Sequence, residues 1–257
     1  MAILGAQQSV TLDSVSIPGV QSVSVGQDVN GTPVSCLGVG FLRQEFLEPT
    51  VGSVSIDRFV IGSDILFTEA QVDGNYSFGD YGVSWTTGFI SSFSLSIAAN
   101  SIPSENITIE THGGFASQSS FSEPLDGEIA SSNTVTTNLG VDVIESLNYT
   151  VNINRETKYK IGSKEGLFGI IEPIEIETQI QYSAIAGATT PSAACTPSDL
   201  DIEIVLKNCD GTTIKTYTAP NSILQGVSYE GQVEGFMKAT ATYKSYIGTG
   251  DLAGLIS

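Results

Sequence analysis

Basic residues and the side chains typical of enzyme active sites are scarce in this sequence. It contains one histidine, three cysteines and one tryptophan, and its ten Lys and Arg residues stand against 28 Asp and Glu residues. The net charge of −18 argues against ordinary nucleic-acid binding, because so few cations cannot assemble a basic patch. The acidic residues are dispersed, which fits simple solubility, a saline habitat, or a surface that a polyanion must pass without sticking.

The shortage of histidine disfavours catalytic triads and histidine-rich metal sites. His112 has no second His or Cys at ligand spacing, so we interpret it as a turn residue beside Gly113-Gly114 rather than as a base or a ligand. A serine without a basic partner stays a weak nucleophile, and no glycine-rich phosphate loop opens a helix. We therefore predict that the protein is not an enzyme, with no catalytic residue, no cofactor-binding residue, no metal ligand and no cofactor.

Other residues that sometimes carry chemistry have simpler explanations here. The Asp-Gly pairs at Asp73, Asp126 and Asp210 lack the spaced carboxylates of a calcium loop, which favours turns. A glycoside hydrolase needs two carboxylates in defined positions, and nothing in the sequence singles out two of the 28 acids. A glycan hydrolase is therefore the least favoured alternative.

The cysteines and the apolar runs indicate the cellular compartment in which we expect the protein. Cys36, Cys195 and Cys209 form no CxxC pair and leave one over, which favours reduced thiols in a cytoplasm. The first residues lack the basic and apolar regions of a signal peptide, and no apolar run reaches the length of a membrane span. We expect a soluble, unexported protein without a membrane anchor.

What the sequence has in abundance is the composition of β-sheet proteins. Ser, Thr, Val, Ile and Gly dominate, and no long stretch places Leu, Ala, Glu and Lys at helical spacing. The clearest strand is 83–98, in which Phe89, Phe93, Leu95 and Ile97 share one parity and serines fill the other. We predict an all-β protein of antiparallel barrel or sandwich type with little helix.

One stretch of the chain occurs twice. Residues 20–49 align without a gap with residues 144–173, and apolar residues keep their alternation through two loops. A shift of one residue would turn every inward side chain outward, so this shared register indicates one β module used twice, in tandem. The identical pairs are Ser22 and Ser146, Asn30 and Asn154, Gly38 and Gly162, Glu48 and Glu172, and Pro49 and Pro173. The apolar pairs are Val23 and Leu147, Val25 and Tyr149, Val29 and Ile153, Leu37 and Ile161, and Leu47 and Ile171.

A second match between the two halves of the sequence predicts where each module ends. Residues 82–85 align with 226–229, so that Trp85 meets Tyr229, and the serine strand aligns with 232–246. We interpret this aromatic pair as a core or interface anchor, with a carbohydrate-stacking platform as the rival. The predicted organisation is an N-terminal arm (1–19), a first module (20–112), a linker or crossover loop (113–140), a second module (141–247) with an insertion at about 184–220, and a C-terminal arm (248–257).

Turn residues predict local structure within the first module. Asn30-Gly31 predicts a hairpin between the strands 20–29 and 33–40, because both residues tolerate positive φ. Residues 41–49 fit a short helical turn or a structured loop. The glycine-rich stretch 73–82 fits a long loop or a hairpin tip.

Two further predictions concern the second module. Residues 200–207 and 212–218 are expected to form a hairpin around Asn208-Cys-Asp-Gly. Glu172, like its counterpart Glu48, precedes a proline at a bend. We expect a structural role for both glutamates, such as a hydrogen bond to backbone or a pairing with a basic residue on a neighbour.

Two β modules, an acidic balance and the lack of a catalytic set resemble the tail tube proteins of tailed bacteriophages and their relatives in contractile injection systems. The elements that carry this resemblance are residues 19–25 and their repeat 144–149, Leu37-Gly38, the bend at Pro49, and the strand 88–99 followed by Ile102-Pro103. They cover about half of the chain, and the resemblance gives both modules the tail-tube type of fold.

The resemblance implies a virion structural protein that is assembled in the host cytoplasm and resides in the viral tail. Antiparallel strands of adjacent subunits would join into one inner β-barrel, and the rings would stack and contact other tail proteins. Many such tubes are sixfold rings of single-module subunits, so a duplicated chain is expected to form a trimer with pseudo-sixfold symmetry, or a hexamer. A bore lined with acid and hydroxyl groups would be a conduit for DNA during ejection, without specific binding.

The principal alternative is a capsid-decorating or receptor-binding module of a virion, built from two immunoglobulin-like sandwiches. Such a protein would also be β-rich, hydroxyl-rich and duplicated. Assembly separates the two predictions, since a sandwich pair should stay monomeric or trimeric whereas tube subunits should stack end to end.

Overall fold

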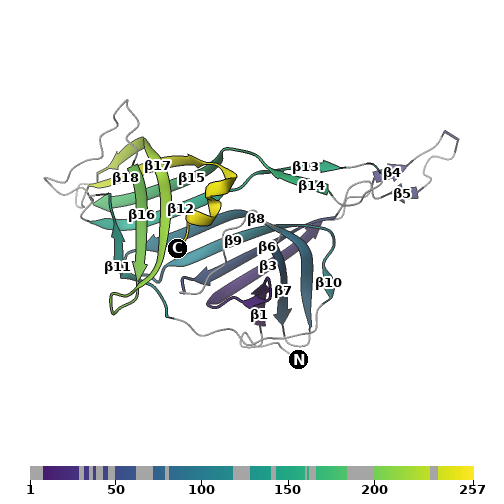
Figure 1. Cartoon of the computed structure of the whole chain (residues 1–257), viewed down its shortest axis with the longest axis horizontal. Helices are drawn as coiled ribbons and strands as arrows, with labels where there is room; N and C mark the ends of the chain where they lie inside the picture. The colour runs from purple at the N-terminus through teal and green to yellow at the C-terminus, as the bar shows by residue number, and fades with distance from the viewer. Residues whose placement is uncertain are drawn as a thin grey trace.

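A computed structural model of the chain describes residues 8–28, 32–34, 37–38, 43–45, 50–61, 72–78, 81–117, 128–139, 143–159, 161, 166–183, 200–231 and 237–257. Nearly all of this is β structure, and the one helix in these ranges is the short 3-10 helix η2 (Thr249–Gly254). The named strands pair antiparallel throughout (Figure 1). The prediction of an all-β, antiparallel protein with little helix is confirmed.

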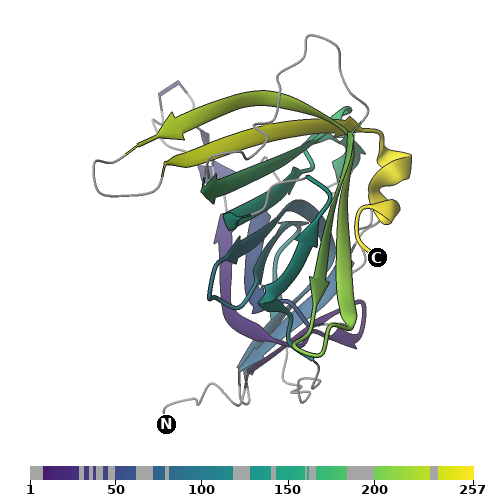
Figure 2. The ribbon, with the colours of Figure 1, turned by 90° about the vertical axis from the view of Figure 1, so that its left-hand side faces the viewer.

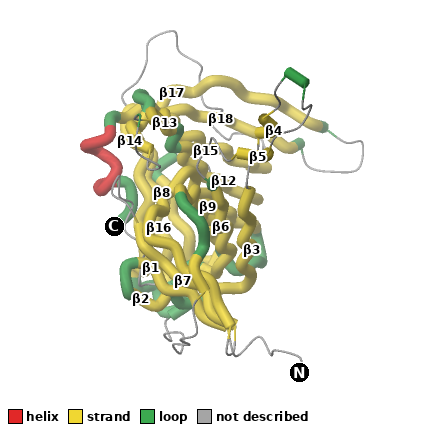
Figure 3. Tube along the Cα trace, turned by 90° about the vertical axis from the view of Figure 1, so that its right-hand side faces the viewer, coloured by secondary structure: helices red, strands yellow, loops and turns green. Residues whose placement is uncertain are grey.

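Eight strands form one continuous layer, which we call the central sheet. Each is hydrogen-bonded to the next in the order β3, β6, β9, β8, β12, β15, β18 and β17 (Figure 3). Their bounds are β3 (Val20–Asp28), β6 (Val51–Phe59), β8 (Tyr81–Ala98), β9 (Ser104–His112), β12 (Ile144–Asn152), β15 (Ile174–Ser183), β17 (Thr213–Glu230) and β18 (Lys238–Ile247). The pairing of β8 with β12 joins four strands of the first half of the chain to four of the second.

The two longest strands of the central sheet, β8 and β17, also take part in a second layer (Figure 2). The first part of β8 pairs with β7 and, through it, with β1, while β2 and β10 extend this layer. The first part of β17 pairs with β16 and, through it, with β11. The bounds are β1 (Gln8–Leu12), β2 (Val15–Ser16), β7 (Val72–Phe78), β10 (Ala116–Ser117), β11 (Ser131–Thr137) and β16 (Leu200–Lys207).

Two hairpins stand apart from these layers and project from the same end of the molecule (Figure 1). Their strands are β4 (Thr32–Val34) with β5 (Arg43–Glu45), and β13 (Arg155–Tyr159) with β14 (Gly166–Ile170). In the chain, one hairpin follows β3 and the other follows β12, and these two strands correspond. Leu37 and Ile161, which lie between the paired strands, are fully exposed, so the prediction that their side chains point inward is wrong.

The strand order of the first half recurs in the second. The order β1, β7, β8, β9, β6, β3 corresponds to β11, β16, β17, β18, β15, β12. Three register shifts recur as well, and because a bulge changes which side chains face the core, they set a residue-by-residue correspondence. The shift between Val20 and Ser22 recurs between Ile144 and Ser146. The shift between Ile90 and Ser92 recurs between Leu224 and Gly226, and the shift between Val72 and Gly74 recurs between Leu200 and Ile202.

One face of the central sheet packs against the second layers and forms the core. Phe93, Leu95 and Ile97 of β8 are buried on this face, as the alternation predicts, and the intervening serines are not. The bulge between Ile90 and Ser92 reverses the alternation, so that Ile90 belongs to the core and Phe89 faces the other side of the sheet, contrary to the prediction. Apolar side chains of both halves belong to one cluster, which includes Leu12 of β1. Each fully buried aliphatic or aromatic side chain of this kind contributes about 1.5–3 kcal/mol.

Two local predictions in the first half are wrong, and a third is confirmed. β3 pairs with β6 rather than with the segment after Asn30-Gly31, and β4 pairs with β5 instead. Val23 and Val25 lie opposite Ile56 and Val54, which are fully buried, so apolar cross-strand contacts outweigh the local turn preference. β5 lies where a helical turn or a structured loop was predicted. The hairpin tip predicted as one alternative for 73–82 is confirmed, because β7 pairs with β8 and Phe78 lies opposite Tyr81.

The correspondence predicted for the end of the module is also wrong. The shared register aligns Trp85 with Ala219, and Tyr229 with Leu95. Trp85 is a core residue at 3% exposure, whereas Tyr229 is 49% exposed, so the two aromatics are not equivalent. The hairpin predicted around Asn208 is confirmed as β16 and β17, which correspond to β7 and β8 rather than to an addition to the module.

Both ends of the described chain pack on the body. β1 and β2 fall within the predicted N-terminal arm, and β1 pairs with β7. In the predicted C-terminal arm, Leu252 and Leu255 are buried, and Ile256 forms a β-bridge with Tyr217. The predicted linker contains β10 and β11, while residues 118–127 lie outside the described residues.

Candidate functional site

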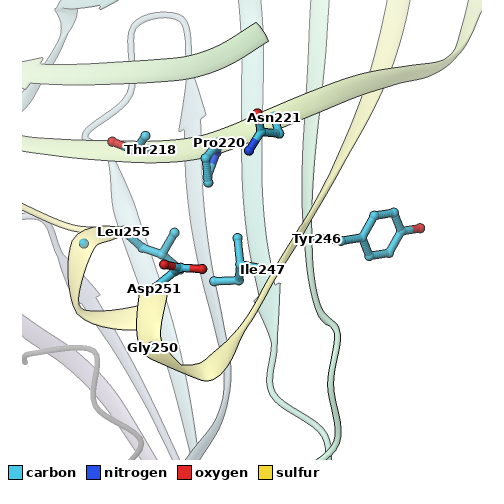
Figure 4. Close-up of a pocket in the computed structure, with 9 residues that line it drawn as sticks. Thr218, Pro220, Asn221, Tyr246, Ile247, Gly250, Asp251 and Leu255 are labelled. Atoms are coloured by element: carbon cyan, nitrogen blue, oxygen red, sulfur yellow. The ribbon is translucent and has the colours of Figure 1, made fainter. Parts of the chain in front are cut away.

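Clusters of metal-binding side chains and pockets are the features of the described ranges that can indicate an enzyme centre. No three His, Cys, Asp or Glu side chains among these residues are placed to bind a metal ion. A pocket of about 430 Å³ lies between β17, β18 and η2, and Asp251 is the one charged residue that lines it (Figure 4). A single carboxylate supplies neither a nucleophile with its base nor a set of metal ligands. No helix in the described part of the chain is long and apolar enough to cross a membrane.

His112 is a packing residue at the end of β9 rather than the predicted turn residue. Its ring stacks on Phe168 of β14 with the ring centroids 3.9 Å apart, and Phe89 lies 5.1 Å from Phe168. Burial lowers the pKa of His112; the Glu110 carboxylate 3.3 Å away opposes this, and Arg155 adds to it. A neutral, stacked imidazole thus holds the hairpin of the second half against the first half.

A buried charged group joins the halves behind the central sheet. Arg58 donates to one oxygen of Glu105 from Nε at 2.7 Å and from a terminal nitrogen at 2.6 Å, and Lys215 contacts the other oxygen at 2.5 Å. The Tyr217 hydroxyl donates to that same oxygen, and none of the four residues exceeds 2% exposure. Burial opposes ionisation of Glu105, but Lys215 and Arg58 outweigh it and lower its pKa. These bonds fix how β17 lies on β6 and β9.

Aromatic rings extend this contact between the halves. Tyr217 of β17 lies 6.0 Å from Phe93 of β8 and 5.8 Å from Tyr149 of β12, measured between ring centroids. The Tyr149 hydroxyl donates to the carbonyl oxygen of Thr218 at 2.9 Å, and burial raises its pKa. The β8–β12 junction is therefore closed from behind by β17.

Arg58, Glu105 and Lys215 form a buried ionic contact that sequence reasoning missed. The signal was present, because Arg58 shares the parity of Val54 and Ile56, and Glu105 that of Ile107 and Ile109. A base and an acid at inward positions of two strands predict a buried ion pair.

The second face of the central sheet, which we call the polar face, is lined by hydroxyl, amide and carboxylate groups. One row of directly opposite residues crosses all its strands: Ser22, Asp57, Asn106, Ser94, Thr150, Glu177, Lys244 and Ile223. The adjacent row is Ser24, Ser55, Thr108, Ser92, Asn152, Glu175 and Tyr246. None of these residues is buried.

Charges on the polar face are mostly acidic and are held in place by neighbours. Asp57 accepts hydrogen bonds from Ser22 and from Asn106, each at 2.5 Å. Lys244, the one basic residue of the two rows, lies 2.6 Å from Glu175 and 3.7 Å from Glu177. Because this cation is paired with two carboxylates, the polar face has a hydrophilic, net acidic surface.

Both outer strands of the central sheet have an edge without a strand partner among the described residues. β3 pairs only with β6, and residues 223–230 of β17 pair only with β18. Neither stretch contains Lys or Pro, the residues with which natural proteins commonly protect an exposed edge. An unprotected edge of this length is a template for a further strand.

Apolar side chains lie at these free edges. Tyr229 faces the core side of β17 but is 49% exposed, and Val25 faces the core side of β3. The corresponding residues at the β8–β12 junction, Leu95 and Tyr149, lie directly opposite each other and are 0% exposed. Ala239 of β18 lies opposite Tyr229 on one side and opposite Tyr182 of β15 on the other. The buried hydroxyl of Tyr182 has no hydrogen-bond partner in the described chain. Each edge thus has the chemistry of one half of a junction.

The structural role predicted for Glu48 and Glu172 can be compared with the structure at Glu172. Glu172 accepts hydrogen bonds from the backbone nitrogen and from the hydroxyl of Thr249, at 2.8 and 2.9 Å, which lower its pKa. The predicted structural role, a hydrogen bond to backbone, is confirmed for Glu172. Glu48 lies outside the described residues.

The remaining predicted positions are structural or undescribed. Asp210 lies in the turn between β16 and β17, where its backbone nitrogen donates to Asn208 at 3.0 Å, whereas Asp73 lies within β7. Cys209 is an exposed free thiol. Cys36, Cys195 and Asp126 lie outside the described residues.

Compared with known proteins, the chain matches no family model, and no curated protein sequence matches it. Its function therefore has to be inferred from the polar face, the free edges and the two hairpins.

Proposed function

We propose that this protein is a structural subunit of a virion tail tube, not an enzyme, and that copies close into rings by pairing β17 of one copy with β3 of the next. The observation that carries the proposal is that β8 and β12, joined within the chain, correspond to β17 and β3, whose outer edges are free. The repeated strand order also supports a tandem duplication of one module. A chain that makes this junction once within itself has the surfaces to make it again between copies.

The internal junction defines the register expected between copies. Leu95 lies opposite Tyr149 where β8 pairs with β12. Transferred through the repeated bulges, this pair becomes Tyr229 opposite Val25 of the next copy. The contact would cover the exposed Tyr229 ring and shield the buried hydroxyl of Tyr182 from water. It would also remove the free edges, which otherwise invite uncontrolled association.

The size of the resulting barrel favours three copies. Strands spaced about 4.8 Å apart and tilted by about 40°, eight from each of three copies, give a backbone circle about 48 Å across. After side chains fill its rim, such a ring still admits a DNA duplex. Six copies would double the circle, which is far wider than the duplex requires. We therefore favour the trimer with pseudo-sixfold symmetry over the hexamer.

The polar face is the one left to line the bore, because the second layers cover the other face of the central sheet. DNA carries about one negative charge per 1.7 Å of its axis, so paired and net acidic residues would not hold it. Serine, threonine and asparagine side chains would keep the wall wetted. The proposed surface is thus a passage for DNA and not a binding site.

The two hairpins supply a surface for stacking the rings. Both project from the same end of the molecule, and each has a fully exposed aliphatic side chain between its strands, Leu37 or Ile161. Exposed apolar groups at corresponding places indicate a contact that is made in the assembly. We assign this contact to the next ring of the tube.

Negative-stain electron microscopy of the purified protein across a concentration series tests the proposal. Rings or tubes with a central hole, and three copies in each ring, are the expected result. Compact isolated particles at every concentration would overturn it and favour the capsid-decorating or receptor-binding module. Rings of six copies would retain the tube but reject the trimer.

A further inference from the structure

The ends of β9 and β18 correspond, yet one is covered and the other is open. His112 on β9 lies opposite Val51, and Tyr246 on β18 lies opposite Glu175, so the shared register places them at the same position. His112 is 7% exposed, whereas Tyr246 is 49% exposed. The Tyr246 ring is directed away from the other labelled residues that line the pocket between β17, β18 and η2 (Figure 4).

The cover over His112 is the hairpin β13–β14. Phe168 of β14 stacks on the His112 ring at 3.9 Å, and Phe89 completes the contact. This hairpin follows β12 directly, and β12 is the strand that pairs with β8. The strand that completes the junction therefore also brings a hairpin over the end of β9.

The hairpin β4–β5 has the corresponding place after β3, and its internal register is the same. Pro33 lies opposite Gln44 as Thr157 lies opposite Phe168, so Gln44 corresponds to Phe168. In the described chain β4 and β5 pair only with each other. The sequence around β5 is apolar, with Phe41-Leu42 before it and Phe46-Leu47 after it. Such a hairpin has the chemistry to cover an aromatic side chain.

We infer that the surface formed by Tyr246 and Ile223, at the end of β18 and on the adjacent part of β17, binds the hairpin β4–β5 of a second copy of this chain. Ile223 corresponds to Phe89 as Tyr246 corresponds to His112. The inference rests on the proposed ring closure, because pairing β3 of the next copy with β17 is what brings that hairpin to this surface. It adds a second contact to each junction, at a place separate from the strand edge.

Site-directed cross-linking tests the inference in a variant whose three cysteines are replaced by serine. A protein with Gln44→Cys is mixed with a protein with Tyr246→Cys under ring-forming conditions and treated with a short bismaleimide. The expected product is a covalent dimer of the two variants. Its yield should be at least tenfold above the yield of a control mixture in which Thr240→Cys, near the start of β18, replaces Tyr246→Cys. A yield equal to that control would overturn the inference.

Two reference pairs separate this outcome from failure of the proposed function. His112→Cys with Phe168→Cys in one chain shows that the reagent spans the corresponding contact. Val25→Cys mixed with Tyr229→Cys reports the strand edge alone. Cross-linking at the edge without cross-linking between positions 44 and 246 overturns the hairpin contact and leaves the ring. Absence of both products, together with absence of rings, overturns the proposed function itself.

Discussion

The closed β8–β12 junction and the free edges of β3 and β17 are built from corresponding strands, but the residues behind them differ. Arg58 and Glu105 lie behind the closed junction, and Lys215 reaches them from β17. At the positions that correspond to Arg58 and Glu105, the second half has Tyr182 and Ala239. One junction is thus fixed by buried ions, whereas the other offers aromatic surface.

Under the proposed function, this difference would separate a contact made in folding from one made in assembly. Separating a buried ion pair exposes or strands charges at a cost of several kcal/mol, which suits a junction that never opens. An exposed tyrosine at a strand edge is tolerated in water and gains free energy when it is covered. In the proposed assembly, the chain completes one junction by itself and would leave the other for a second copy.

Replacing Glu105 should have the largest effect. Glu105→Leu leaves Arg58 and Lys215 buried without their carboxylate, so we expect a loss of about 3–5 kcal/mol in the free energy of unfolding. Urea unfolding followed by tyrosine fluorescence measures it. The pKa of Glu105 is lowered in the folded state, so its contribution is complete above the ordinary value of 4.5 and is lost as pH falls below it. The variant should therefore lose less stability than the natural chain on acidification.

A matched control distinguishes lost charge pairing from lost packing. A triple variant with Arg58→Tyr, Glu105→Ala and Lys215→Met has no buried charge at this place. Its residues 58 and 105 are those found at the corresponding positions 182 and 239 of the second half. This triple variant should recover most of the stability that Glu105→Leu loses, because apolar groups often replace a buried ionic group without cost. Equal losses in both variants would show that packing, not charge, closes the junction.

Replacing Tyr229 should act on assembly and not on folding. Tyr229→Ser removes a ring that would be covered at each junction, worth about 1.5–3 kcal/mol, which weakens each contact about 10- to 100-fold. Analytical ultracentrifugation across concentrations should show monomers under conditions in which we expect the natural chain to form rings. Tyr81→Ser, which removes another exposed tyrosine at 67% exposure, is the control and should leave assembly unchanged. Rings of normal stability in Tyr229→Ser would refute the edge contact.

Alternation along single strands was predictable from the sequence because it depends on neighbouring residues alone. Phe93, Leu95 and Ile97 face the core as expected, whereas the bulge between Ile90 and Ser92 turns Phe89 to the other face. The repeat of 20–49 correctly aligned β3 with β12, down to the bulge after their first residues. Local pattern and shared register together carried these predictions.

Strand pairing was not predictable in the same way, since it joins segments far apart in the chain. Asn30-Gly31 carries a strong hairpin signal, yet β3 pairs with β6 because buried valine and isoleucine side chains lie across from it. The match of residues 82–85 with 226–229 rested on three residue types and misplaced the second module's end. The free edges and the cover over His112 emerge only from the assembled sheet.

A smaller change in the free energy of unfolding is expected from His112 on acidification, because its imidazole is covered. Burial lowers its pKa in the folded state, so between the ordinary value of 6.5 and the folded value the unfolded chain binds more protons. The natural chain should lose stability as pH falls through this window, whereas His112→Phe keeps the stacked ring and does not titrate. Urea unfolding at about pH 7.5 and pH 5.5 compares the two slopes. A steeper loss in the variant would contradict the assignment of a neutral, buried imidazole.

The smallest expected effect lies where the C-terminal segment closes over the second half. Glu172 accepts two hydrogen bonds from Thr249, and η2 then buries Leu252 beside β17. Glu172→Gln keeps the shape but weakens these bonds, so we expect the midpoint of thermal unfolding to fall by no more than a few degrees. Ring formation should persist, because neither free edge includes Glu172. If this variant abolished rings while leaving the thermal midpoint unchanged, the C-terminal segment would belong to the assembly contact, and the division between closed and open junctions would have to be redrawn.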